Sequence, residues 1–393
     1  MGGEGSMYEL SREELKKMGA EITTGEICRQ PELWQEVIDM YKVKKEIIDE
    51  FLDEIKEKEG KVRVIFTGAG TSQYVGDTLV PYLNLHGDHE SFIFQSVGTT
   101  DIVASPEEYL FKDDPTLLVS FARSGGSPES IAAVKIANKY IKNVRHMTIT
   151  CAKEGKLAQN AGSDPNNLLL LMPGYSNDKG FAMTGSFSCM VLSSLLIFDK
   201  TAIKEKANYV QTLIKLGREV IEREKEIKQF IDCDYNRIIY LGSGSLAGLT
   251  REAQLKVLEL TAGKIATVFD SSMGFRHGPK SFVDNKTIVF DFVNNNPYTR
   301  QYDIDILEEI HSDDIAAQVV AIAQPGSISY SGNTFEFTAG KEFLPDGYLA
   351  LADIMFAQTV ALYSSIKVGN TPDTPSPTGT VNRVVKGVTI HSF

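Results

Sequence analysis

The sequence has few cysteines, and they are not clustered. Cys28, Cys151, Cys189 and Cys233 lie far apart, and no Cys-x-x-Cys pair or Cys/His cluster accompanies them. This spacing argues against a structural zinc site and against a disulfide framework. It fits a protein of the reducing cytoplasm, and we expect no bound metal.

Long apolar runs and an excess of basic residues are also missing. The longest apolar candidate, Met190 to Phe198, is far shorter than the ~20 residues of a membrane helix. The first residues contain neither the basic stretch nor the apolar core of a secretory signal. The net charge is −12, whereas nucleic-acid-binding proteins concentrate positive charge. We therefore expect a cytoplasmic protein with no membrane and no nucleic acid among its partners.

The sequence does contain enough apolar residues for two ordinary domains. Of its 393 residues 42% are hydrophobic and 23% are charged, which is typical of globular proteins. Two glycine-rich turns, each after an apolar β-like run, indicate an internal repeat. Val62–Phe66 leads into Thr67-Gly68-Ala69-Gly70-Thr71-Ser72, and Arg237–Leu241 leads into Gly242-Ser243-Gly244-Ser245.

Strand-like and helix-like segments alternate in both halves. We expect strands at 62–66, 91–95, 116–121, 145–150 and 168–172, and again at 237–241, 266–269, 287–292, 318–323 and 334–337. Helices are expected at 8–58, 72–85, 128–141, 183–199, 203–230, 246–261, 303–312 and 347–366. This βαβ alternation predicts an α/β fold with two mostly parallel, flavodoxin-like sheets of five strands.

The same pattern gives the expected domain organisation. An N-terminal helical segment spans 1–50, a first domain 51–200, a connecting helix 201–230 and a second domain 231–370. Residues 371–393 begin with a Pro-rich stretch that cannot form a helix or a strand. We expect this tail to fold back over an active site.

Hydroxyl-rich turns form the strongest candidate for a ligand site. Ser72, Ser124 and Ser127 follow predicted strands, and ligands of open α/β sheets bind at the carboxyl ends of strands. Glycines and free N–H groups at such turns suit a phosphate monoester; the candidate site also contains Gly70, Thr71, Gly125 and Arg123, with Thr184 and Ser186 in a later turn. The alternative is that these residues only cap helices. A dinucleotide site is disfavoured because Gln73 interrupts the Gly-x-Gly-x-x-Gly pattern.

Three further residues are candidates for proton transfer. Glu259 lies seven residues after Glu252 on one face of a predicted helix, so it is either a general base or an ion-paired surface carboxylate. His277, between Arg276 and Gly278-Pro279, is a candidate proton carrier at neutral pH or a simple loop residue. Lys386 near the C-terminus is, from its spacing alone, a solvated charge.

Taken together, these motifs resemble the sugar isomerase (SIS) family of phosphosugar-binding domains over residues 25–393, as two tandem domains. The chain looks closest to the bacterial tagatose-6-phosphate ketose/aldose isomerase and galactosamine-6-phosphate deaminase group. It is also similar to the isomerase half of glucosamine-6-phosphate synthase. The motifs that carry the resemblance are Thr23-Thr24-Gly25-Glu26-Ile27, Gly68-Ala69-Gly70-Thr71-Ser72, Ser124-Gly125-Gly126-Ser127, His277-Gly278-Pro279 and Asn382-Arg383-Val384-Val385-Lys386.

The resemblance implies specific roles. Glu259 would be the catalytic base, His277 the ring-opening histidine, acting in a neighbouring subunit's site, and Lys386 a catalytic lysine in the tail. The implied substrate is a hexose or hexosamine 6-phosphate, best galactosamine 6-phosphate, converted to tagatose 6-phosphate and ammonia without a cofactor. A homodimer or larger homo-oligomer is expected. Ala122-Arg123 replaces a Ser-Gln pair, so Arg123 would compensate for a lost phosphate hydroxyl. A plain ketose/aldose isomerase, a fructosamine-6-phosphate deglycase and a non-catalytic phosphosugar-binding regulator remain alternatives.

Overall fold

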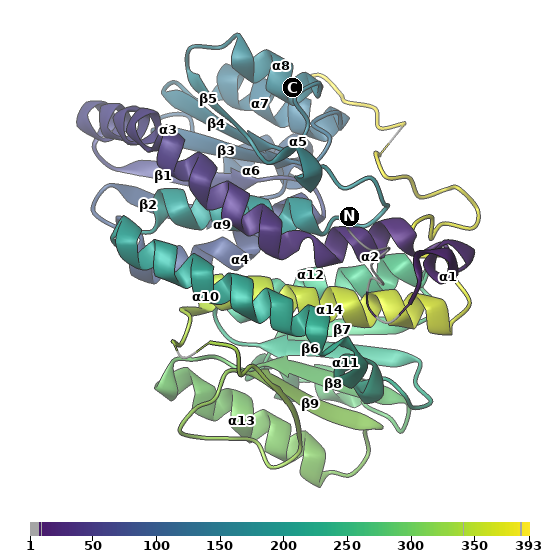
Figure 1. Cartoon of the computed structure of the whole chain (residues 1–393). Coiled ribbons are helices and arrows are strands. Elements are labelled where there is room, and N and C mark those ends of the chain that lie inside the picture. Colours follow the sequence, from purple (N-terminus) through teal and green to yellow (C-terminus); the bar gives the residue numbers. More distant parts are fainter. Residues whose placement is uncertain (1–7, 9, 341, 386) are drawn as a thin grey trace, which may run out of the picture. The chain divides into compact units, whose positions relative to one another are not determined.

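The computed structural model describes residues 8, 10–340, 342–385 and 387–393. These residues form two compact units, each built on its own sheet (Figure 1). The sheet-1 unit comprises Leu33–Asp178, Gly185–Ala207 and Val381–Phe393. The sheet-2 unit comprises the described residues up to Glu32, then Lys179–Thr184 and Asn208–Thr380. The chain thus passes between the units several times, and the domain boundaries expected from the sequence remain a prediction.

Sheet 1 is fully parallel and has the strand order β2-β1-β3-β4-β5. Its strands are β1 (Val62–Thr67), β2 (Phe92–Ser96), β3 (Thr116–Ala122), β4 (Val144–Thr150) and β5 (Asn167–Leu171). The helices around it are α3 (Gln30–Glu59), α4 (Thr71–His86), α5 (Thr99–Ala104), α6 (Pro106–Tyr109), α7 (Pro128–Tyr140), α8 (Lys156–Gly162) and α9 (Gly185–Phe198), with the short η1 (Gly174–Ser176). All six residues of β1 are buried, in keeping with its mostly apolar sequence, and the charged exception is the buried Arg63.

Side chains of alternating β1 residues pack on opposite faces of sheet 1. Ile65 joins a buried cluster with Leu118 and with Ile136 of α7. The ring of Phe66 instead packs edge-on against Phe198 of α9, with ring centroids 5.4 Å apart. Because successive side chains of a strand point to opposite faces, β1 packs against helices on both sides of the sheet.

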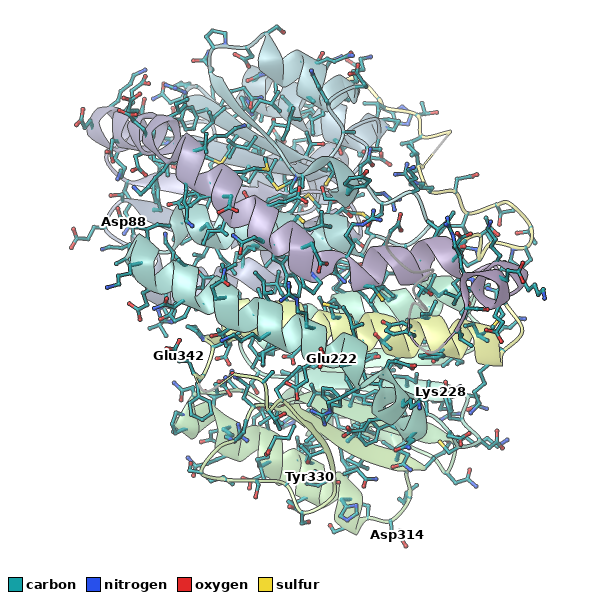
Figure 2. The ribbon with its side chains drawn as sticks, in the orientation of Figure 1. Asp88, Glu222, Lys228, Asp314, Tyr330 and Glu342 are labelled. Carbon is teal, nitrogen blue, oxygen red and sulfur yellow. The ribbon has the colours of Figure 1, made fainter. Side chains whose placement is uncertain are left out.

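Sheet 2 repeats this plan with the order β10-β9-β8-β6-β7, again fully parallel. Its strands are β6 (Arg237–Gly242), β7 (Ala266–Ser271), β8 (Thr287–Phe292), β9 (Gln318–Ala323) and β10 (Asn333–Glu336). The helices of this unit are α1 (Arg12–Lys17), α2 (Glu21–Cys28), α10 (Ile203–Glu222, shared with the sheet-1 unit), α11 (Glu224–Phe230), α12 (Ser245–Leu260), α13 (Pro297–Ser312) and α14 (Asp346–Lys367), with the short η2 (Gly274–Arg276) and η3 (Pro279–Phe282). One face of the sheet is covered by a buried apolar cluster that includes Val289 of β8, Leu307 of α13 and Tyr330. Tyr330 is labelled in Figure 2.

The expected strands and fold class are confirmed, and the helices differ in detail. The continuous helix expected over 8–58 is broken into α1, α2 and α3, and the capping box of Ser11 and Glu14 starts α1. Helix α13 begins at Pro297 rather than 303, because Asn296 caps it by accepting the N–H groups of Tyr298 and Thr299.

Helix α14 is longer than the Met190–Phe198 run on which the sequence argument relied. Its 22 residues are by length and composition sufficient to cross a membrane. However, 94% of the apolar window is buried within the protein, where α14 packs on α12 and α11. Its apolar composition therefore has a structural explanation as a core helix.

Candidate functional site

The first glycine turn of sheet 1 joins β1 to α4. A Cβ at Gly68 would lie 2.5 Å from the backbone carbon of Ser72, and Gly70 has a left-handed φ of +56°. Both positions therefore require glycine. The two glycines allow helix α4 to begin at Thr71, directly after the turn. Ser72, which is only 6% exposed, lies in the first turn of this helix. The N–H groups at this helix end are suited to an anion.

The second hydroxyl-rich turn lies at the same edge of the sheet, because β3 is the parallel neighbour of β1. Ser127 occupies the N-cap position of α7 but makes no side-chain capping bond, and its hydroxyl lies 2.6 Å from the Ser130 hydroxyl. Ser124 and Ser127 are both partly exposed. A Cβ on Gly155, in the loop between β4 and α8, would lie 2.3 Å from the Ser124 carbonyl oxygen. Position 155 must therefore be glycine for this loop to pack against the Ser124 turn.

Arg123 of this turn contacts the C-terminal segment. Its guanidinium is buried, and Nη2 donates a 2.8 Å hydrogen bond to the Arg383 carbonyl oxygen. Arg383 in turn donates from Nε to the Asp178 carbonyl at 2.9 Å and from Nη2 to the Asn177 side chain at 3.0 Å. The tail is therefore joined by hydrogen bonds to two loops of the sheet-1 unit.

The end of the tail is held a second time, on α7. The Phe393 ring packs against Tyr140 with centroids 5.7 Å apart, and Lys139 donates to the Phe393 carbonyl. We call Val381–Phe393 the C-terminal strap, since both ends are attached to the same unit. Lys386, the predicted catalytic lysine, belongs to this segment but lies outside the described residues.

Thr184 and Ser186, the predicted sugar-binding residues, are almost fully buried, at 1% and 0% exposure. The Ser186 hydroxyl and N–H both donate to the Asp178 carboxylate, at 2.5 and 3.0 Å, and the Gly185 N–H donates to its other oxygen. Asp178 therefore caps α9, and its own carbonyl receives Arg383. The sugar-binding role of Thr184 and Ser186 stays a prediction.

In the sheet-2 unit, Glu259 belongs to a charged triad on α12. The Lys256 ammonium lies 2.7 Å from the Glu259 carboxylate and 3.2 Å from that of Glu252. Lys256 and Glu252 are 1% and 0% exposed, whereas the Glu259 side chain keeps 24% exposure. Burial by itself lowers the pKa of Lys256, but the two carboxylates outweigh burial and raise its pKa. A buried, charged lysine thus holds a solvent-reachable carboxylate in place.

His277 lies at the exposed tip of the loop between η2 and η3. Phe275, two residues earlier, is 0% exposed and joins the core beside α13. Gly278, directly after the histidine, has a φ of +125°, which other residues rarely adopt. The histidine is therefore displayed outward from an anchored loop.

The turn after β6 repeats the backbone of the first turn but not its side chains. Gly244 has a φ of +60°, and a Cβ at Gly242 would lie 2.9 Å from Leu246. Ser243, however, donates its hydroxyl to the Asp303 carboxylate, which also accepts the Asn294 N–H at 2.9 Å. Burial raises the pKa of Asp303 above its usual range. A carboxyl group of the chain itself thus accepts the hydrogen bond of the Ser243 hydroxyl in this turn.

Comparison with known proteins identifies the family. The SIS domain profile matches residues 59–198. The chain is 44% identical over 381 residues to D-galactosamine-6-phosphate deaminase AgaS of Escherichia coli O157:H7, covering 94% of this chain and 96% of that one. The chain belongs to the SIS-domain family. Among solved structures, a tagatose-6-phosphate ketose/aldose isomerase of Escherichia coli shares 40% identity with a TM-score of 0.85, over 94% of this chain and 96% of that chain.

A second SIS-domain structure of the same isomerase group, from Clostridium novyi NT, matches still better. It has 42% identity and a TM-score of 0.91 and covers 100% of both chains. These relatives support the predicted group, while the individual site residues rest on the geometry above.

Sequence reasoning missed several residues that organise this SIS-domain chain. Lys256 was visible four residues after Glu252 and three before Glu259, which is the spacing of one helix face. Asp178 and Arg383 had no local signal, because each acts on residues far away in the sequence. Arg123 was predicted to compensate for a lost phosphate hydroxyl, and its hydrogen bond to the strap was not foreseen.

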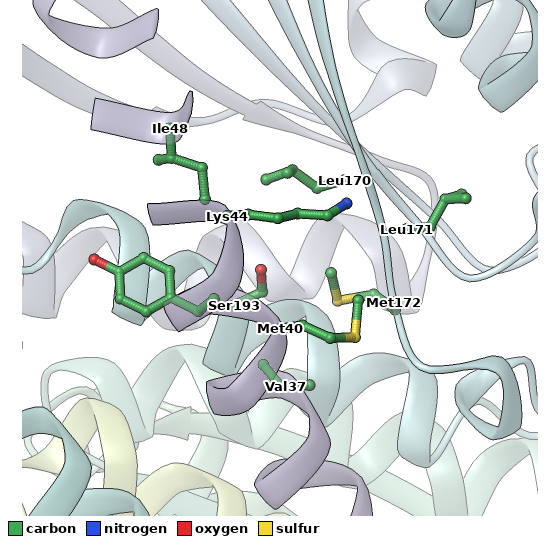
Figure 3. Close-up of a pocket in the computed structure, with 9 residues that line it drawn as sticks. Val37, Met40, Lys44, Ile48, Leu170, Leu171, Met172 and Ser193 are labelled. Carbon is green, nitrogen blue, oxygen red and sulfur yellow. The ribbon is translucent and has the colours of Figure 1, made fainter. Parts of the chain in front are cut away.

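A small, shallow hollow lies elsewhere on the sheet-1 unit (Figure 3). It is lined by Val37, Met40, Tyr41, Lys44 and Ile48 of α3, by Leu170, Leu171 and Met172, and by Ser193. None of the predicted site residues borders it. Its lining is mostly apolar and contains no glycine, unlike the two turns.

Proposed function

We propose that the protein is a phosphosugar isomerase/deaminase that converts D-galactosamine 6-phosphate and water into tagatose 6-phosphate and ammonia. The observation that carries the proposal is the 44% identity, over 94% of the chain, to a D-galactosamine-6-phosphate deaminase. The anion-ready turns of sheet 1 and the buried lysine–carboxylate triad of α12 supply the chemistry that such a reaction needs.

The phosphate would bind at the turns after β1 and β3. Ser72, Ser124 and Ser127 would donate their hydroxyls. The first turns of α4 and α7 would contribute backbone N–H groups and favourable helix dipoles. Gly70 and Gly125 allow the backbone to approach the ligand, since both have positive φ values. These contacts would fix the substrate at the end remote from the reacting carbons.

The chemistry begins with opening of the sugar ring. His277 would move a proton from the C1 hydroxyl and to the ring oxygen, which yields the open-chain aldehyde. Glu259 would then take the C2 proton, giving an enolamine, and return it to C1. The resulting C2 ketimine is attacked by water, and cleavage of its C–N bond releases ammonia and the ketose phosphate. Lys386 would stabilise the developing oxyanion.

Lys256 explains how Glu259 can serve this role. A carboxylate base must point its oxygen at the carbon-bound proton, and a 2.7 Å ion pair to a buried lysine limits its rotamers. Glu252, itself fully buried, holds the other side of that ammonium.

We also propose that the working form is a cytoplasmic homo-oligomer in which His277 acts in a neighbouring subunit. The outward display of this residue supports the idea. Inactive Glu259→Gln and His277→Ala subunits, once exchanged, would then restore activity, since a shared site carries both native groups. No recovery after verified exchange would assign His277 to its own subunit.

A plain ketose/aldose isomerase is the second candidate, because a 40% identical relative is named for that activity. Proton transfer between C2 and C1 is common to both reactions. Purified protein should be supplied separately with galactosamine 6-phosphate, glucosamine 6-phosphate and tagatose 6-phosphate, while ammonia and sugar products are measured. Ammonia from the galacto substrate supports the deaminase, whereas aldose–ketose conversion without ammonia supports the isomerase.

A further inference from the structure

An ion cluster brackets the loop that carries His277. Arg276, directly before the histidine, donates from Nε to Oε2 of Glu309 at 2.6 Å. Lys280, three residues after it, donates to Oε1 of the same carboxylate, also at 2.6 Å. One glutamate of α13 therefore binds both flanks of the loop through its two oxygens.

A second acid extends the cluster. The Lys280 ammonium lies 2.6 Å from the Asp313 carboxylate at the C-cap of α13. Hydrogen bonds from Lys280 and Arg276 hold the pKa of Glu309 below its usual range. The four side chains are 28 to 36% exposed, so no single pair is strongly stabilising, but a network that shares one carboxylate has a defined geometry.

Apolar contacts fix the loop beneath these charges. Phe275 is fully buried, and Phe282 packs against the same core. Arg237 donates at 2.8 Å to the Phe282 carbonyl. Between these anchors, His277 and Gly278 remain exposed. The loop is therefore anchored on both sides of the exposed His277.

We propose that Glu309 is a positioning residue for the reaction, which holds the His277 imidazole in a fixed outward orientation through Arg276 and Lys280. The inference rests on the proposed function, in which His277 opens the sugar ring. Proton transfer is fast only when the transferring group is held at a fixed distance from the proton. A looser loop would therefore lower kcat and leave phosphate binding unchanged.

The test compares Glu309→Gln with Glu308→Gln. The control removes an equal charge from the preceding residue of α13, whose carboxylate binds Ser331 instead. We expect Glu309→Gln to lower kcat by about 5- to 10-fold with KM nearly unchanged. The control should stay within twofold of the parent, and Glu309→Asp, which keeps the charge, should recover part of the loss.

Two further measurements separate positioning from general stability. In a His277→Ala background, Glu309→Gln should cost less than twofold, because no imidazole remains to be positioned. Amide hydrogen exchange of residues 274–283 should accelerate in Glu309→Gln but not in Glu308→Gln. An equal loss with and without His277, or an unchanged kcat in Glu309→Gln, would overturn the inference. A fully active His277→Ala variant would overturn both the inference and the role of His277 in the proposed function.

Discussion

The glycine turns after β1 and β6 have the same backbone conformation but different neighbouring side chains. In each turn a first glycine, Gly68 or Gly242, leaves room for the backbone of the following helix. The second glycine, Gly70 or Gly244, has a φ near +60°. In sheet 1 the surrounding groups are hydroxyls and Arg123, whereas in sheet 2 the carboxyl of Asp303 bonds to Ser243. The repeated backbone thus creates two potential anion sites, and in sheet 2 an internal carboxyl group takes the place of a ligand.

The acidic character of the second site extends beyond one residue. Burial, and then the neighbouring Asp303, raise the pKa of Asp291 well above its usual range. Burial also raises the pKa of Asp346 to about 6. A phosphate at this turn would have to compete with the Asp303 carboxyl group for the Ser243 hydroxyl. The comparison teaches that a shared turn geometry predicts where an anion could bind, while side chains supplied by later helices decide whether it does.

The largest expected effect tests the division of work between the halves. Glu259→Gln should reduce kcat by about 10²- to 10⁴-fold, because an amide cannot accept the C2 proton. Substrate binding, measured by calorimetry, should persist, since the phosphate turns belong to the other sheet. Glu222→Gln, an exposed carboxylate on α10, is the matched control. If more than half of the activity survives in Glu259→Gln, the base is another residue, with Glu252 the next to test.

The second effect sharpens the comparison of the two turns. Ser124→Ala and Ser127→Ala should each weaken binding by about 10- to 100-fold, as loss of a hydrogen bond to a charged oxygen costs roughly 1.5–3 kcal/mol. Ser243→Ala removes the matching kind of hydroxyl from sheet 2 and should leave KM unchanged. Equal effects at Ser124 and Ser243 would contradict the difference that we describe.

A third prediction concerns the strap, which attaches to sheet 1. Lys386→Met should lower kcat at least about 10-fold, or about 1.4 kcal/mol, with little change in Tm. Arg383→Ala should lower kcat as well and should also speed tryptic cleavage after Lys386, since its bonds to Asn177 and Asp178 are lost.

Arg123→Ala should reproduce both effects of Arg383→Ala if Arg123 serves the strap. Lys142→Ala, a charge loss on an exposed residue of the same unit, is the control and should change neither cleavage nor kcat. A large rise in KM for Arg123→Ala, without faster cleavage, would return Arg123 to phosphate binding.

The smallest expected effect concerns a buried carboxyl group of the sheet-2 unit and the pH dependence of stability. Asp353 of α14 is fully buried, and both its carboxylate oxygens are without a hydrogen-bond partner among the described residues. Burial first, and then the charge of Asp346, raise its pKa well above the usual value. Because the folded state favours the protonated form, stability declines as the pH rises above about 4, the unfolded pKa, and stops declining above the folded pKa.

Replacement by the neutral isostere removes this dependence. Asp353→Asn should raise the free energy of unfolding by at least about 1 kcal/mol at pH 8, and the gain should shrink toward pH 4. Urea unfolding of both proteins across this pH range provides the measurement. A variant that is less stable than the parent at pH 8 would show that the carboxyl group has a favourable partner.

The fold was predictable because its signals are local. Buried parallel strands, such as residues 288–290 of β8 and 319–323 of β9, are rich in apolar residues, and glycine turns mark the ends of β1 and β6. Hydroxyl positions at the turns after β1 and β3 follow from the same logic. Contacts of residues distant in sequence left no such signal: Asp303 reaches back 60 residues to Ser243, and Arg383 reaches Asp178 across 205 residues. Lys256 was the exception, since helical spacing alone places it between two glutamates.

The most direct test of the proposed function is the fate of nitrogen from D-galactosamine 6-phosphate. Ammonia and tagatose 6-phosphate should be measured together over one time course, with Glu259→Gln as the blank. The account predicts that the two products form in a one-to-one ratio and that the blank forms neither at a comparable rate. Binding of the phosphosugar without release of ammonia, or ammonia release that persists in Glu259→Gln, would contradict it.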